Sequence, residues 1–141
     1  MKAEFIAPES LLRDNMVEVR SFKHENYSKA AHSHEFYEIE IVLKGTGTHA
    51  IEDNSLKIVA GDVFVIPPFI VHSYENTKDL TVQHVLFSRE TIDNGKKNTS
   101  TYPGFLHFTE IEPYLRGRFS AMRFLHLSQS EEHTSELQSQ L

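Results

Sequence analysis

The 141-residue sequence contains no cysteine, which excludes a disulfide-stapled scaffold, a thiolate zinc site and a cysteine nucleophile. It also lacks an apolar run that approaches the roughly 20 residues a membrane-spanning helix requires. Residues 1–15 have neither the basic start nor the long apolar stretch of a signal peptide, and we expect them to form an N-terminal arm. These absences predict a cytoplasmic protein without a membrane partner.

Concentrated positive charge is missing as well. The formal net charge is −6 at pH 7, and no run of basic residues is longer than Lys96-Lys97. Because phosphate backbones are bound by a concentrated basic face, this chain alone is a poor candidate for binding nucleic acid. The phosphate-binding loop, the dinucleotide fingerprint, the nucleophile elbow and the zinc-protease helix motif are absent from the sequence too.

Short segments of alternating polar and apolar residues, separated by turn residues, dominate residues 16–87. Their regular spacing predicts about seven or eight strands in an antiparallel sandwich or barrel. Residues 45–47 and 76–79 contain glycine, asparagine or aspartate and are expected to be turns between strands. The length and this pattern predict a single all-β domain. The expected strands are residues 16–22, 37–43, 48–51, 56–59, 63–66, 69–74 and 80–87.

Beyond these strands the pattern weakens. A helical turn is expected after Pro103, and the Glu112-Pro113 step predicts a boundary because a residue before proline avoids the helical region. Residues 119–127 fit either a strand or a short helix. The polar residues 130–141 are expected to be unstructured. They resemble the translated adapter at the broken end of an assembled sequence, in which case the natural chain continues; a native polar tail is the alternative.

Histidines and glutamates at even-numbered positions are the candidate functional residues. His32, His34 and Glu38 would share one face of an extended chain. His72 begins a later strand, and if the two strands face each other, three imidazoles and one carboxylate surround one point. This donor set suits a divalent metal such as zinc, iron, nickel or manganese. The alternative is a metal-free polar pocket that hydrogen-bonds a ligand directly.

Three further polar side chains are candidates for binding a ligand. Glu40 is an even-numbered position like Glu38, so in a regular strand it would also point into the barrel and accept hydroxyl hydrogens from a sugar. We slightly favour the alternative, in which a β-bulge after Glu38 turns the Glu40 side chain to solvent. Tyr74, His84 and His49 lie on expected strands, where a structural role is the ordinary expectation. The candidate ligand-binding residues are His32, His34, Glu38, Glu40, His72, Tyr74 and His84.

Residues 32–45 and 61–76 resemble the two motifs of the cupin superfamily. They read H-x-H-x₃-E-x₆-G and G-x₅-P-x₄-H-x₃-N, and the match spans residues 30–87. The family's glycine upstream of the first histidine is Asn26 here, and its glycine after the proline is Phe69. The resemblance implies a double-stranded β-helix, a small jelly-roll barrel, that encloses the three histidines and the glutamate proposed above as metal ligands.

The sequence around these motifs, over residues 15–129, resembles the N-terminal sensor domains of AraC-type transcription regulators. The segments 34–39, 61–68 and 85–87 carry this likeness. It implies a domain, residues 16–129, that binds a small-molecule effector, often a sugar, and forms a homodimer. The DNA-reading helix-turn-helix part would follow, since nothing after residue 88 offers two consecutive amphipathic helices with a basic face.

A stand-alone metal-dependent cupin enzyme, such as an isomerase or a dioxygenase, is the alternative function. The four candidate metal ligands favour it, because an octahedral metal would keep two positions for substrate. No additional acid–base constellation stands out in the sequence, so we expect a sensor rather than an enzyme.

Overall fold

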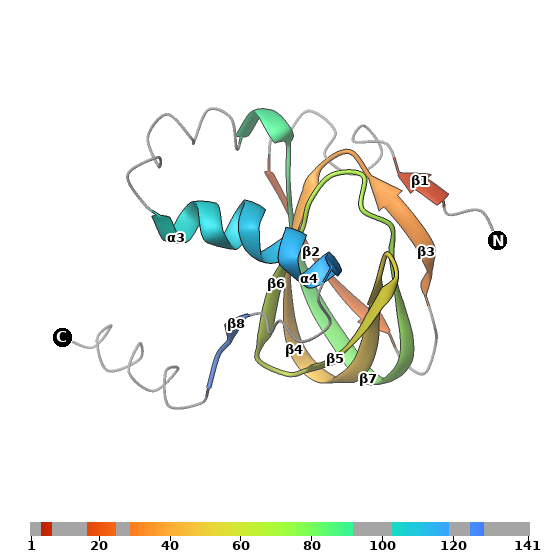
Figure 1. The fold of residues 1–141 in the computed structure, drawn as a ribbon. Helices are drawn as coiled ribbons and strands as arrows, with labels where there is room; N and C mark the ends of the chain where they lie inside the picture. Colours follow the sequence, from red (N-terminus) through yellow and green to blue (C-terminus); the bar gives the residue numbers. More distant parts are fainter. Residues whose placement is uncertain (1–3, 7–16, 25–28, 92–102, 119–124, 129–141) are drawn as a thin grey trace.

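The computed structural model describes residues 4–6, 17–24, 29–91, 103–118 and 125–128. The strands in this part of the chain wrap into a barrel, and a helical segment lies along its outside (Figure 1). The predicted all-β jelly-roll class is therefore confirmed. The elements are β1 (Glu4–Ile6), β2 (Val17–His24), β3 (Lys29–His34), β4 (Tyr37–Ile51), β5 (Asn54–Val59), β6 (Asp62–Ile66), β7 (His72–Phe87), α3 (Pro103–Leu106), the π-helix η1 (His107–Ile111), α4 (Glu112–Arg118) and β8 (Leu125–His126).

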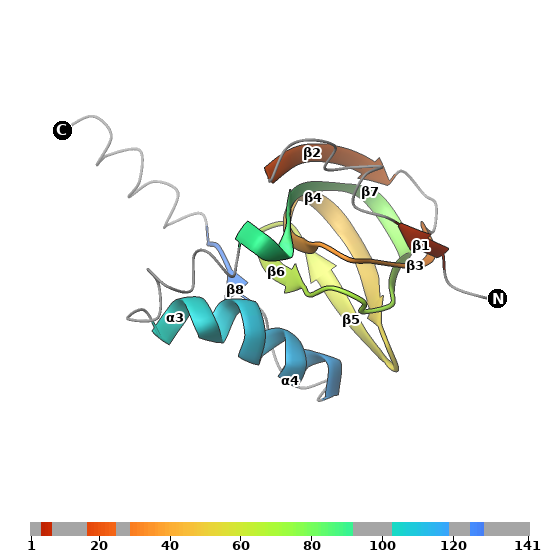
Figure 2. The same ribbon diagram turned by 90° about the horizontal axis from the view of Figure 1, so that it is seen from above.

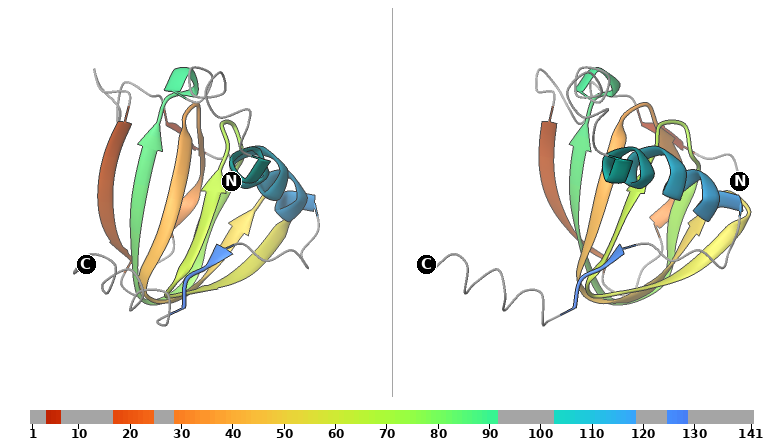
Figure 3. Two further views of the ribbon diagram at one scale, coloured as in Figure 1. Left: turned by 90° about the vertical axis from the view of Figure 1, so that its left-hand side faces the viewer. Right: turned by 60° about the vertical axis from the view of Figure 1, so that its left-hand side comes forward.

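Two long strands, β4 and β7, form the centre of the sheet. They pair antiparallel along their whole length, from Tyr37↔Phe87 to Ile51↔His72. The first half of β4 pairs on its other edge with β6, and the second half pairs with β5. β2 and β3 in turn line the free edge of β7. Figure 3 shows β2, β7, β4 and β6 side by side in this order.

Two predicted turns are wrong, because the chain bends there without reversing. β4 runs unbroken through residues 45–47, and β7 runs unbroken through residues 76–79. Gly45 has φ of +80°, and the β4–β7 register shifts between Val42 and Thr48, so these residues form bulges that curve both strands into a barrel. Within the described residues 17–24 and 29–87 the chain consequently forms six strands rather than seven or eight.

The barrel interior has an apolar end and a polar end. Seven buried apolar side chains pack together at the apolar end, and burying each one stabilises the fold by roughly 1.5–3 kcal/mol. The polar end is filled by buried histidines and glutamates instead, so apolar packing alone does not explain why these residues stand there. The apolar cluster is Val42, Ile58, Phe64, Ile66, Tyr74, Leu80 and Val82, and the rings of Phe64 and Tyr74 also lie beside the buried His49, where the apolar and polar ends meet.

The helical segment covers part of the outer face of the barrel. Phe105 and Phe108 pack on a small cluster built from Tyr37, Val65 and Phe87, whose side chains point out of the barrel wall. Seen from above, α3 and α4 run along the outside of the barrel on the side of β6 and β8 (Figure 2). The outward apolar face of β4 and β7 therefore positions the helices, whereas the inward face forms the site.

The C-terminal expectations are met in part. A helix does follow Pro103, and the boundary expected at Glu112-Pro113 falls where η1 ends at Ile111 and α4 begins at Glu112, so the helical segment changes its type there but continues. Proline is tolerated in the first turn of a helix, which explains its place in α4. Residues 125–126 form a strand that pairs with β6. Residues 119–124, residues 130–141 and most of the expected N-terminal arm lie outside the described residues.

Candidate functional site

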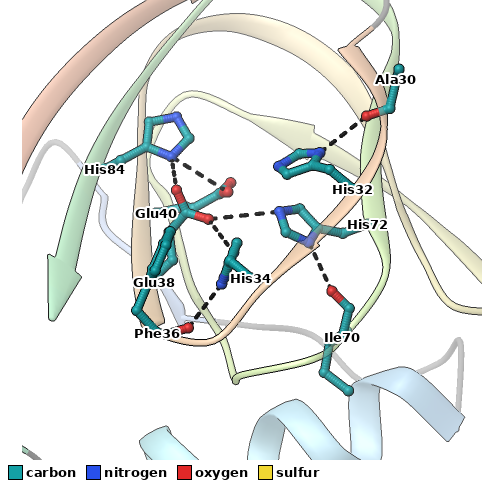
Figure 4. Close-up of polar contacts among 9 residues, drawn as sticks. All are labelled: Ala30, His32, His34, Phe36, Glu38, Glu40, Ile70, His72 and His84. Atoms are coloured by element: carbon teal, nitrogen blue, oxygen red, sulfur yellow. Dashed lines mark hydrogen bonds and ion pairs between the residues drawn. The ribbon is translucent and has the colours of Figure 1, made fainter. Parts of the chain in front are cut away.

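The candidate site is the polar end of the barrel interior. β3 contributes His32 and His34, β4 contributes two glutamates, and β7 contributes two histidines and a tyrosine. All seven side chains predicted from the sequence are buried, none more than 5% exposed. Figure 4 shows six of them converging on the same space. They are His32, His34, Glu38, Glu40, His72, Tyr74 and His84.

Glu40 lies inside the barrel, and the bulge expected after Glu38 is wrong. Regular pairing of Glu38 with Leu86 and of Glu40 with His84 keeps both carboxylates on the inner face. The register first shifts after Val42, so the inward parity of β4 changes only beyond the site. Glu40 is 0% exposed as a result. Two carboxylates therefore share this end of the barrel.

Backbone carbonyls fix the orientation of three imidazoles. The Nδ1 atoms of His32, His34 and His72 lie 3.0, 2.8 and 3.1 Å from the carbonyl oxygens of Ala30, Phe36 and Ile70. A carbonyl oxygen can only accept, so each Nδ1 carries the proton and donates it. Nε2 of His34 and of His72 faces Glu38; when it carries a proton it points that proton at the carboxylate, and when the ring is neutral it offers a lone pair of the kind that binds a metal.

Glu38 is the centre of the polar contacts. Its Oε2 lies 3.0 Å from His34 Nε2 and 3.6 Å from His72 Nε2, and its Oε1 contacts His84 Nδ1. Burial alone would raise the pKa of Glu38, but its contacts with His34, His72 and His84 and the charge of His84 outweigh burial and hold the pKa well below the usual 4.5. The carboxylate is consequently ionised.

His72 is kept neutral. Burial lowers its pKa from the ordinary 6.5, and this effect exceeds the opposing attraction of Glu38. A neutral imidazole beside an ionised carboxylate is the protonation state from which a metal is bound. The ligand atoms of His34, Glu38 and His72 all lie within 4.8 Å of one another.

His32 stands beside this group and outside the set of close ligand atoms. Its ring centroid is 4.2 Å from that of His72 and 6.3 Å from that of His34. Of the four residues expected from the sequence to bind a metal, three bring their donor atoms close together, and the imidazole of the fourth lies next to them. Two imidazole nitrogens and one or two oxygens of an ionised glutamate fit a borderline divalent metal.

Two further residues near the site were not among the binding candidates chosen from the sequence. His49, to which a structural role was given, is fully buried, with its ring 5.7 Å from His72 and 4.8 Å from Phe64. Arg20 of β2 is the register partner of His84 on β7, so its side chain lies on the same face of the sheet as that of His84. Strand pairing decides which side chains of β4 point inward beyond its bulges, and it also decides which face of β2 points inward. No local sequence pattern could therefore identify His49 or Arg20.

The chain turns at Phe69 of the second motif, at the position where the cupin motif has a glycine. Phe69 has φ of +66°, a left-handed conformation that ordinary side chains disfavour. Its N–H donates to the carbonyl oxygen of His34 at 2.7 Å. The turn before His72 thus also holds the end of β3, so one strained residue positions two of the imidazoles.

A barrel that encloses a buried, polar, partly ionised site defines the class of small-molecule-binding jelly-roll domains. Residues 15–141 match the family model described as the AraC-like ligand binding domain. The match spans most of the chain, and the protein belongs to this family. No helix within the described ranges is both long and apolar enough to cross a membrane.

The chain is also similar to parts of longer proteins. It is 36% identical over 76 residues to the HTH-type transcriptional activator RhaR of Enterobacter sp. (strain 638), which covers 54% of this chain and 27% of that protein. RhaR of Escherichia coli (strain K12) is 34% identical over 76 residues, which again cover 54% of this chain and 27% of that protein. The chain therefore spans about a quarter of the length of these relatives.

Among solved structures, a cupin-2 domain protein from Shewanella frigidimarina has 25% identity and a TM-score of 0.46, covering 50% of this chain and 70% of that one. A cupin 2 conserved barrel domain protein from Salinispora arenicola has 23% identity and a TM-score of 0.49, covering 59% of this chain and 72% of that one.

Proposed function

We propose that this chain is the effector-sensing and dimerisation domain of an AraC-type transcription regulator that acts in the cytoplasm. Membership of the AraC-like ligand binding family and the similarity to RhaR support this role. The single observation that carries it is the barrel interior, where buried carboxylates and imidazoles stand where a purely structural barrel would have apolar side chains.

The interior suits a small polyhydroxylated molecule such as a sugar. Glu38 and Glu40 accept hydroxyl hydrogens, and His84 and Tyr74 add groups able to donate or accept. Phe64, with its ring against His49, adds an aromatic wall of the kind on which a sugar ring packs. Fixed strand positions hold these groups before the ligand arrives, which reduces the entropy cost of binding.

Regulation would act through the outside of the barrel. Effector binding shifts the domain between two states only by its different affinity for each of them. A homodimer would cover exposed apolar side chains such as Val19 and Leu43, which are 59% and 52% exposed. DNA would be read by a separate part of the regulator, since the match covers 27% of the RhaR protein.

A divalent metal, with zinc, iron, nickel or manganese as candidates, would be held by His34, Glu38 and His72, with His32 beside them. The metal would supply a Lewis-acidic centre that binds effector oxygens. The residues of the chain fix the orientation of the three imidazoles through their Nδ1 atoms and keep Glu38 ionised.

Calorimetric titration of the full chain with a panel of neutral sugars and polyols tests the sensing function. We expect one compound to bind, and Glu40→Gln to weaken that binding about tenfold to a hundredfold, since a hydrogen bond to a charged group contributes about 1.5–3 kcal/mol. Glu52→Gln, a matched change in the exposed β4–β5 turn, should leave the affinity unchanged.

The same buried cluster also favours the metal-dependent enzyme as a second candidate. Incubating metal-loaded protein with each compound that binds, and analysing the mixture for isomerised or oxidised product, separates the two functions. A sensor returns the compound unchanged, whereas turnover would replace the sensing proposal with the enzymatic one.

A further inference from the structure

The outer surface of the barrel carries a hollow that is separate from the polar interior. Its volume is about 470 Å³, which is within the range of sites that bind small molecules. Strand β4 runs beneath it, with β5 on one side and β7 on the other. None of the seven candidate site residues lines the hollow, whereas Ile58 of the apolar cluster does. The hollow therefore lies over the apolar end of the barrel.

Irregular backbone surrounds this outer hollow. The β4–β7 register shifts between Thr46 and Thr48, and a bulge of this kind bends a strand and changes the direction of its side chains. Asn76 of β7 also lines the hollow and has φ of +50°, a conformation for which asparagine is enriched. Asn76 is the last residue of the second sequence motif, so that motif ends at the outer hollow and not among the interior ligands.

The lining of the outer hollow is cationic and rich in hydrogen-bond donors. Lys57 and Lys78 are its charged residues, and no carboxylate belongs to the lining. Thr46 and Thr48 add two hydroxyl groups and Asn76 adds an amide, so all five polar side chains can donate a hydrogen bond. The formal net charge of the whole chain is −6, so this lining reverses the sign of the chain's charge locally.

The two lysines approach the hollow from opposite sides of β4. Lys57 on β5 is the register partner of Thr48, and Lys78 on β7 is the register partner of Thr46. Neighbouring strands are about 4.8 Å apart, so β5 and β7 are separated by about 10 Å across β4. Two flexible four-carbon side chains span this width from both sides. Both ammonium groups can therefore contact one anionic group above the two threonines.

We propose that the outer hollow binds a small phosphate ester, with its phosphate group between Lys57 and Lys78. A phosphate monoester carries about −1.5 to −2 charges at pH 7 and three strong acceptor oxygens, which match two ammonium groups and a lining of donors. A single carboxylate has half that charge and fewer acceptor oxygens. Val59, which is 42% exposed and lines the hollow, provides apolar surface for the organic part of the ester. This site does not depend on the sensing function proposed for the interior.

Nuclear magnetic resonance of the ¹⁵N-labelled full chain locates the binding. Glycerol 1-phosphate is the probe, and glycerol and succinate are compared with it at the same ionic strength. We expect glycerol 1-phosphate to cause saturable shifts of the backbone amide signals of Thr46, Thr48 and Asn76, succinate to bind more weakly, and glycerol not to bind there. Shifts centred on the barrel interior, no saturable shift, or equally tight binding of succinate would overturn the proposal.

Variants of the two lysines test the assigned contacts. Lys57→Gln and Lys78→Gln should each weaken binding of glycerol 1-phosphate by about threefold to tenfold, as expected when one charged hydrogen bond is lost at an exposed site. Arg89→Gln removes an exposed positive charge after the end of β7 and should leave the affinity unchanged. Circular dichroism establishes that each variant is folded. An equal loss in all three variants would indicate general charge attraction and would overturn the site.

The two titrations separate this site from the sensing function. A protein that binds a sugar in its interior but gives no shifts with glycerol 1-phosphate would overturn the outer site and leave the sensor intact. A protein that binds the ester at Thr46, Thr48 and Asn76 but none of the sugars would retain the outer site and remove the support for sugar sensing.

Discussion

The hydroxyl of Tyr37 donates a hydrogen bond to Oε1 of Glu110 at 3.0 Å. Tyr37 precedes Glu38 on β4 and points out of the barrel, whereas Glu110 lies on η1. Adjacent residues of one strand thus contact the binding site on one side and the helical segment on the other. A shift of β4 on effector binding would reach the helices through this contact.

Removing this contact should destabilise the fold. Tyr37 is 6% exposed and its partner is a carboxylate, so Tyr37→Phe should lower the free energy of unfolding by about 1–2 kcal/mol. Urea unfolding measures the change. Glu110→Gln should cost a similar amount, and the double variant should cost little more than either single one. Additive losses would show that the two residues do not act together.

Gly45 should tolerate no side chain. A Cβ there would lie 2.4 Å from the carbonyl oxygens of Lys78 and Asp79, and its φ is +80°. Gly45→Ala should therefore lower the free energy of unfolding by more than about 2 kcal/mol. Gly104→Ala is the matched control, because a Cβ at that helical position meets nothing within 4 Å. Equal stability of the two variants would contradict the bulge at Gly45.

The motif spacing predicted which side chains converge inside the barrel, because it reports local geometry. His32, His34 and Glu38 share parity, and His72 begins its strand, so their convergence follows from strand periodicity and the motif resemblance together. β3 and β4 are separate strands joined by a bend, yet the even side chains still meet. The continuity of β4 and β7 was not predictable, since a glycine at a bulge and a glycine at a turn give the same local signal.

The orientation of Glu40 could not be predicted for a related reason. Whether a bulge falls after Glu38 or after Val42 is decided by pairing with β6 and β7, which lie far along the chain. The inward position of Arg20 depends in the same way on its register with His84. Sequence patterns therefore predicted the residues of the motifs but not all of the residues that surround them.

Phe69 provides a test of the turn that replaces the family's glycine. A left-handed conformation costs a non-glycine residue about 1–2 kcal/mol, which glycine avoids. The side chain is 56% exposed, so removing it exposes little new surface. Phe69→Gly should be more stable than Phe69→Ala by about 1 kcal/mol, since both lose the ring and only glycine relieves the strain. Thermal or urea unfolding of this pair measures the difference, and an alanine variant of equal stability would argue against the left-handed turn.

Acid should destabilise the metal-free protein in two steps. The folded state holds the pKa of His72 below 6.5 and that of Glu38 well below 4.5, so in each window the unfolded chain binds more protons than the folded one. The free energy of unfolding should therefore fall as the pH drops below about 6.5 and fall further below about 4.5. Urea unfolding in a chelator between pH 7.5 and pH 4 follows this loss.

His72→Gln isolates the first step. Glutamine keeps an amide donor near Glu38 but does not titrate, so the loss of stability between pH 7.5 and pH 5.5 should be smaller than in the unaltered protein, while the loss below about pH 4.5 remains. Saturating Mn²⁺ should steepen the first step, because protons compete with the ion for the same imidazoles. A variant whose stability follows the same pH curve as the unaltered protein would show that His72 gains its proton equally easily in the folded and unfolded states.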